Sequence, residues 1–157
     1  MNSLLSKMSA QIKTTQSLRF YALDQLTDAD LAYSLPGNPP LGELFRQEGE
    51  FEQSYVDSYK RMRQDFLYQH EDHSVENSVA ALRQWFTALD ESLENAMLGL
   101  TEEEVQTRMI DRGGWTISPT NQAHTYIETL LIFYGKLSVY MRALGKPFSE
   151  RWMEWIA

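Results

Sequence analysis

The sequence predicts an all-α protein, an up-down bundle of four long helices that spans residues 1–157 as a single domain. Three observations predict this fold. Apolar residues recur at steps of three and four in four long segments. Stretches rich in proline and glycine separate the first two of these segments. The third segment carries three clean heptads, which suit a seam inside a bundle.

The first two helices are expected at residues 3–25 and 40–66. Between them, residues 31–40 form a long connection whose prolines exclude a regular helix. Glu48 is the sole charged member of the apolar face of the second helix. The apolar positions of the two helices are Leu5, Met8, Ile12, Leu18, Ala22, Leu41, Leu44, Phe45, Phe51, Tyr55, Tyr59, Met62 and Phe66.

The third helix is expected to begin at Ser74, a good N-cap, after an exposed loop at residues 68–73. Its heptad seam is Val75, Val79, Leu82, Phe86, Leu89, Leu93, Ala96 and Leu100. Thr101 and Glu104 form a capping box for a short helical turn. A second long connection follows, in which the glycine pair at residues 113–114 suits a turn or a hairpin that positions Trp115.

The last helix is expected at residues 118–144, with Ser118 as N-cap and a proline in the first helical position. Gly145 and Pro147 supply its stop signals. The tail after it is rich in aromatic residues at helical spacing. Such a tail either folds back onto the bundle or contacts a second subunit.

Composition restricts the class of protein. The chain has 157 residues, enough for one domain, and no apolar run approaches the roughly 20 residues that a membrane span requires. We expect its first residues to belong to the folded structure and not to a signal peptide. The absence of cysteine excludes disulfides, thiolate metal sites and a cysteine nucleophile, and agrees with a cytoplasmic protein.

The formal net charge of −8 argues against nucleic acid as a partner, because nucleic-acid binding depends on basic patches that neutralise phosphates. The longest basic cluster, at residues 60–63, is explained by a solvated helix face. The same acidity disfavours anionic membrane surfaces. We therefore expect neither nucleic-acid nor membrane partners, and we expect a homodimer formed by exposed apolar helix faces or by the aromatic tail.

Four features together point to a known family. They are the connection ending in PPLGEL (residues 39–44), the run QEGEFE (residues 47–52), the last long helix, and its ending RALGKPFSERWMEWI (residues 142–156). In these features the chain resembles the DinB-like four-helix bundles, a superfamily that also includes bacterial thiol-dependent transferases. The resemblance covers nearly the whole chain in the order and length of its elements.

The resemblance also implies where a metal would be bound. Metal-binding members carry a histidine about five residues before a glutamate in the second helix, and a His-x-x-x-His pair just before a glycine in the fourth. With Glu52 and Gly135 on the family glutamate and glycine, the ligand positions fall on Gln47, Thr129 and Phe133. None of the three is a histidine. The resemblance therefore predicts the fold and argues against metal and against any cofactor.

Two other groups of polar residues are candidates for a site. His124 and Glu128 lie four residues apart on one helix face and could begin a metal or catalytic site, completed by Glu48 or by the loop histidines His70 and His73. Alternatively, His124 is solvated with Glu128 as its partner.

Gln47, Glu48 and Glu52 could project into the bundle beside Thr129 and form a polar pocket, in which a glutamate could act as an acid or base. For Glu52 we expect the solvated face instead, and for Glu48 both placements stay open.

A ligand pocket, if one exists, is expected to be lined by Gln47, Phe51, Trp115, Thr129 and Phe133. Phe133 would fill the space that a metal and its water occupy in the family. Trp115 would act as a lid or would merely cover the helix ends. The aromatic residues of the second and fourth helices could line this cavity, although helical spacing is more typical of core residues.

The leading hypothesis is a small cytoplasmic DinB-like bundle without metal that acts as a small-ligand-binding or interaction module. The alternative is an enzyme, similar to a thiol transferase or a small-molecule hydrolase, with a rearranged site around His124, Glu128 and Glu48. A third possibility is a purely structural dimer with no ligand. The enzyme requires its three side chains to converge in a cleft, and the module does not.

Overall fold

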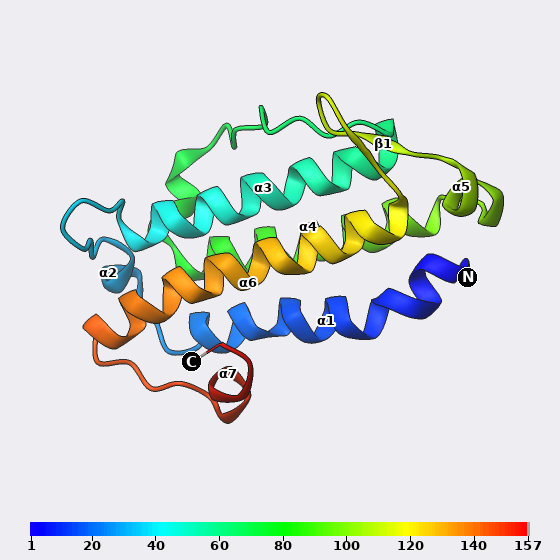
Figure 1. Cartoon of the computed structure of the whole chain (residues 1–157). Helices are drawn as coiled ribbons and strands as arrows, with labels where there is room; N and C mark the ends of the chain where they lie inside the picture. The colour runs from blue at the N-terminus through cyan, green and yellow to red at the C-terminus, as the bar shows by residue number, and fades with distance from the viewer. Residues whose placement is uncertain (157) are drawn as a thin grey trace.

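A computed structural model describes residues 1–156. Four long helices form the bundle: α1 (Ser3–Leu23), α3 (Leu41–Arg61), α4 (Val79–Leu98) and α6 (Pro119–Ala143) (Figure 1). The shorter elements are α2 (Asp28–Leu31), the 3₁₀ helix η1 (His73–Asn77), α5 (Glu102–Thr107), the hairpin strands β1 (Ile110–Asp111) and β2 (Thr116–Ile117), and α7 (Glu150–Trp155). The all-α bundle and its two expected long connections are confirmed.

Polar side chains begin most of these helices, as their sequences predict. The Ser118 hydroxyl accepts a hydrogen bond from the Asn121 N–H, and Thr101 and Glu104 form their capping box. The start of α4 differs from the prediction: Ser78, and not Ser74, caps it, because the preceding residues form the separate turn η1. Helix α3 also ends earlier than expected, at Met62, whose left-handed backbone (φ 53°) turns the chain.

The four long helices pack in a ring in which α1 contacts α4 and α6, and α3 contacts the same two helices. Helices α1 and α3 therefore lie on a diagonal of the bundle, although they follow one another in the chain. Side chains from all four helices meet along the central axis, where the apolar core lies. Within residues 1–156, no helix combines the length and the hydropathy required to cross a bilayer.

The connection between α3 and α4, residues 62–78, determines the direction of α4. It runs back along the bundle, so that α4 starts beside the start of α3 (Figure 1). At this end the Val79 N–H donates to Asp28 of α2, at 2.8 Å. A connection of this length can reach about 50 Å, which exceeds the roughly 30 Å of a 21-residue helix. Helices α3 and α4 are thus parallel, and the up-down order expected from the sequence is corrected for this pair.

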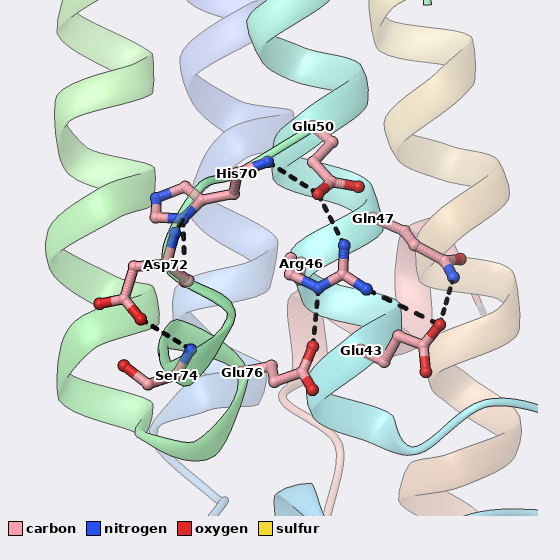
Figure 2. A network of polar contacts seen from close by, with 8 residues as sticks. All are labelled: Glu43, Arg46, Gln47, Glu50, His70, Asp72, Ser74 and Glu76. Carbon is pink, nitrogen blue, oxygen red and sulfur yellow. Dashed lines mark hydrogen bonds and ion pairs between the residues drawn. The ribbon is translucent and has the colours of Figure 1, made fainter. Parts of the chain in front are cut away.

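Arg46 of α3 fastens this connection to the bundle (Figure 2). Its guanidinium lies 2.6 Å from Glu50 on its own helix and 2.7 Å from Glu76 of η1. It also forms a longer ion pair with Glu43 at 3.8 Å. Glu50 accepts a second hydrogen bond from the His70 N–H, at 2.9 Å. Charged contacts therefore hold the connection at two points along α3.

The C-terminal segment folds back onto the bundle through α7. Gly145 adopts a left-handed conformation (φ 65°) that ends α6, as its position predicts. Trp152 is buried, with its ring centroid 5.3 Å from that of Tyr134, and its indole N–H donates to the Ser138 hydroxyl at 2.9 Å. Trp155 stays partly exposed. At least this part of the aromatic tail is therefore core structure.

Candidate functional site

A buried group of charged residues lies at the centre of the bundle. We call it the core ionic cluster: Arg19 of α1, Glu48 and Glu52 of α3, and Asp90 of α4. Arg19, Glu48 and Glu52 are each at most 2% exposed. Burial of a charge is costly unless it is paired, so the partners of Arg19 decide whether the fold tolerates it.

Arg19 crosses the diagonal of the bundle to reach its partners. Its Nη1 lies 2.6 Å from Glu52 Oε1 and 3.7 Å from Glu48 Oε1, while its Nη2 donates to Asp90. The guanidinium carbon also lies 4.4 Å from the centre of the Phe86 ring, a cation–π geometry. One arginine thus links three of the four long helices.

The fourth long helix joins the cluster through Tyr126. Its hydroxyl donates to Glu52 Oε2 at 2.8 Å and accepts a hydrogen bond from the Gln16 amide at 2.9 Å. Tyr134, also on α6, is buried nearby, and its hydroxyl has no hydrogen-bond partner within residues 1–156. The same is true of Glu48 Oε1 and Arg19 Nε. The cluster is therefore well bonded around Glu52 and poorly bonded around Glu48.

Three carboxylates face one guanidinium, and this imbalance changes their protonation. Burial, reinforced by the Glu52 charge, raises the pKa of Glu48 well above its ordinary value. Burial also raises the pKa of Glu52 to about 7, against the opposing effect of Arg19. The pKa of Asp90 is raised for the same reason. Burial, without a hydrogen bond to Oε1 within residues 1–156, therefore favours the protonated, neutral form of Glu48.

These placements correct one expectation from the sequence. Glu52 lies in the core and not on the solvated face, and Glu48, for which both placements were open, is buried beside it. Sequence reasoning did not identify Arg19 or Asp90. The signal was present: both residues lie three or four positions from apolar residues on the buried stripe of their helices, so one arginine and three carboxyl groups face the same core.

The cluster borders a groove between α1 and α4, which we call the α1–α4 groove. It encloses about 210 Å³. One end is lined by the apolar residues Leu5, Ile12, Leu93 and Met97, and the other, more polar end is lined by Gln16 and Asp90 together with Phe20. Asp90 is the member of the cluster that reaches this groove, since its side chain is 22% exposed. The core ionic cluster is therefore connected to the protein surface at the α1–α4 groove, through Asp90.

The structure does not bring the alternative catalytic residues together. His124 and Glu128 are exposed on α6, whereas Glu48 is in the core. His73 is exposed as well, and His70 packs its ring 4.3 Å from that of Trp85. Within residues 1–156, no three histidine, aspartate or glutamate side chains are grouped so as to hold a metal ion.

The residues of the expected ligand pocket are each engaged by protein contacts. Thr129 shares a hydrogen bond of 2.8 Å with the Tyr55 hydroxyl, and Phe133 is buried with its ring centroid 5.6 Å from that of Phe51. Gln47 donates to Glu43 at 3.1 Å. The ring of Phe133 has no donor atom for a metal, and the Thr129 hydroxyl already takes part in a hydrogen bond.

Trp115 lies apart from these residues, on the hairpin between β1 and β2. Trp115 is 53% exposed, and the centre of its ring lies 5.0 Å from the guanidinium carbon of Arg112. Arg112 in turn donates to Gln122 and Thr125 of α6, at 3.0 Å each. The hairpin itself is confirmed, with Ile110 opposite Ile117. A lid function for Trp115 stays a prediction.

Solved structures similar to this chain include two DinB-like proteins. A DinB-like protein from Bacillus subtilis matches with a TM-score of 0.65 and 17% sequence identity, over 94% of this chain and 97% of its own. A DinB-like protein from Bacillus cereus ATCC 10987 matches with a TM-score of 0.61 and 19% identity, over 93% of both chains. No protein-family model and no curated protein matches the sequence. The chain therefore has the DinB-like fold, as the resemblance predicted.

Proposed function

We propose that this DinB-like bundle is a small cytoplasmic protein without a resident metal, and that it binds a small molecule in the α1–α4 groove. The observation that carries the proposal is the groove itself: a largely apolar recess of about 210 Å³ that has the polar side chains of Gln16 and Asp90, beside Phe20, at one end. Binding sites for small molecules combine these two properties, an apolar lining and a few fixed polar groups.

The rigidity of the polar end supports this assignment. Asp90 is held by the buried Arg19, and Gln16 is held by Tyr126, so neither group must be ordered when a ligand arrives. Binding then costs less conformational entropy than it would at a mobile surface. The pocket expected from the sequence is a weaker candidate, because Phe133 and Thr129 already use their side chains in protein contacts.

The absence of a resident metal is supported by the chemistry of the family positions. Gln47, Thr129 and Phe133 offer one amide, one hydroxyl and one hydrocarbon ring, whereas metal sites of this type use imidazole, carboxylate or thiolate donors. The test is the metal content of protein purified without chelator or affinity tag, followed by thermal unfolding with zinc, nickel and manganese. We expect no stoichiometric metal and no rise in melting temperature. One equivalent with a clear rise would contradict the proposal.

Ligand binding is tested with 1-hexanol as a neutral apolar probe, followed by amide chemical shifts in NMR spectra. We expect saturable shifts at residues of α1 and α4 that line the groove. The substitution Ser9→Leu fills the groove and should abolish these shifts, since Ser9 lines it. Ser92→Leu is the matched control, because this half-buried serine of α4 lines a different cavity with Tyr59 and Lys60. Absence of saturable shifts in the parent protein would refute the assignment.

A further inference from the structure

The polar end of the α1–α4 groove presents hydrogen-bond acceptors. Asp90 uses Oδ1 for Arg19 and keeps part of its side chain exposed in the groove. Gln16 is 5% exposed and donates its amide N–H to Tyr126, while its amide oxygen accepts no hydrogen bond from residues 1–156. This oxygen keeps access to solvent, so a donor group of a ligand can replace water there.

The charges around this end are predominantly negative. Lys13 is the cation that lines the groove, and it is 2.8 Å from Glu94, which neutralises it. Glu91 also lines the groove, is exposed, and has no ion pair within the described part of the chain. The guanidinium of Arg19 is shared between Asp90 and Glu52. An anionic ligand would meet the uncompensated carboxylate of Glu91 here, and a cationic one would meet complementary charge.

The apolar and the polar residues of the lining are concentrated at opposite ends of the groove. Along α1 the lining runs from Leu5 through Gln16 to Phe20, and along α4 it runs in the reverse direction from Met97 to Asp90. A ligand that fits both ends has a short hydrocarbon tail and a head that donates hydrogen bonds and carries positive charge.

We propose that the α1–α4 groove selects small amphipathic amines, with the ammonium group bound by Asp90, Gln16 and Glu91 and the hydrocarbon tail packed along Ile12, Leu93 and Met97. This inference rests on the proposed function, the binding of a small molecule in the same groove. It adds the chemical class of the ligand.

Three probes of equal chain length distinguish the binding of a small molecule in the groove from the preference for amines. They are hexylammonium, 1-hexanol and hexanoate, each titrated at pH 7 by NMR and by calorimetry. We expect hexylammonium to bind about tenfold more tightly than 1-hexanol, because a single modest charge interaction changes the affinity by about this factor. We expect hexanoate to bind most weakly of the three. Equal affinities for hexylammonium and 1-hexanol would overturn the amine preference and leave the groove as a ligand site. No binding of any probe would overturn both.

Variants then test the named acceptors. Glu91→Gln removes a charge that is outside the core ionic cluster, so it should reduce the hexylammonium preference several-fold without changing the melting temperature. Glu103→Gln is the control, because it removes one exposed carboxylate on α5, away from the groove. Asp90→Asn should reduce the preference further. If that variant does not fold, Glu91→Gln decides the question, and a preference unchanged by it would overturn the assignment of Glu91.

Discussion

Arg19 illustrates how much one side chain can determine in this bundle. It is completely buried, and its partners come from two other helices. The substitution Arg19→Met would leave Glu52 and Asp90 without their counter-ion. Loss of one member of a buried ion pair typically costs about 3–5 kcal/mol of stability. We expect a loss of this size in urea unfolding at pH 7.

Arg83→Met provides the matched control for Arg19→Met. Arg83 pairs with Asp24, also between α4 and α1, but the two side chains are 40% and 56% exposed. An exposed pair contributes about 0–1 kcal/mol. Equal losses in the two variants would show that burial does not set the importance of Arg19.

The protonation of Glu48 and Glu52 predicts how stability depends on pH. Both pKa values are raised in the folded protein, that of Glu52 to about 7, so the folded state binds more protons than the unfolded chain above the ordinary pKa of glutamate. Stability should therefore fall as pH rises from 5 to 8, by at most about 1.4 kcal/mol per pH unit for each proton.

Glu48→Gln is the variant that tests this pH dependence, because it replaces a carboxyl group whose pKa is raised by an amide of similar shape that does not titrate. We expect it to flatten the dependence of the unfolding free energy on pH, measured by urea titration at several pH values. Glu52→Gln should instead destabilise the protein at all of them, since Glu52 accepts hydrogen bonds from both Arg19 and Tyr126. An unchanged pH profile in Glu48→Gln would contradict the assignment.

At the scale of elements, the contact between α3 and η1 depends on a glycine. A Cβ at Gly42 would lie 1.9 Å from the backbone carbonyl oxygen of Glu76, which cannot move without displacing η1. Gly42→Ala should therefore destabilise the protein despite the better helix propensity of alanine, as thermal unfolding would show.

Gly135→Ala is the control at a helical glycine with open space. A Cβ there meets nothing within 4 Å, and the position is exposed in α6. Alanine should stabilise the protein by about 0.5–1 kcal/mol, the cost of glycine in a helix interior. A stabilising Gly42→Ala would show that η1 is free to shift.

Some elements of the fold could be predicted from the sequence, and others could not. Helix existence, the caps at Ser118 and Thr101, and the hairpin are local features, and all were predictable from periodicity and turn chemistry. The direction of α4 was not, because a connection long enough to return along the bundle permits either orientation. Of the candidate site, Glu48 was recognised as unusual, whereas its partner Arg19 requires knowledge of which helices face one another.

At the scale of the whole molecule, the homodimer expected from the sequence stays a prediction. Exposed apolar side chains suited to such an interface include Ile132 and Val139 on α6 and Trp155 on α7. Sedimentation velocity at several concentrations measures the oligomeric state, and we expect a dimer. Ile132→Lys should shift the population toward monomer if α6 forms the interface, with the exposed Leu98→Lys on α4 as control. A monomer at all concentrations would contradict the prediction.

The ring order of the helices has a consequence for the order of events during synthesis. Helix α1 leaves the ribosome before the other three long helices. Its neighbours α4 and α6 are translated much later, and the next long helix, α3, lies across the diagonal. Until the second half of the chain emerges, α1 has no adjacent helix to cover its apolar stripe, and Arg19 stays hydrated. Burial of this arginine must therefore belong to the last stage of assembly, when all four helices close around it together.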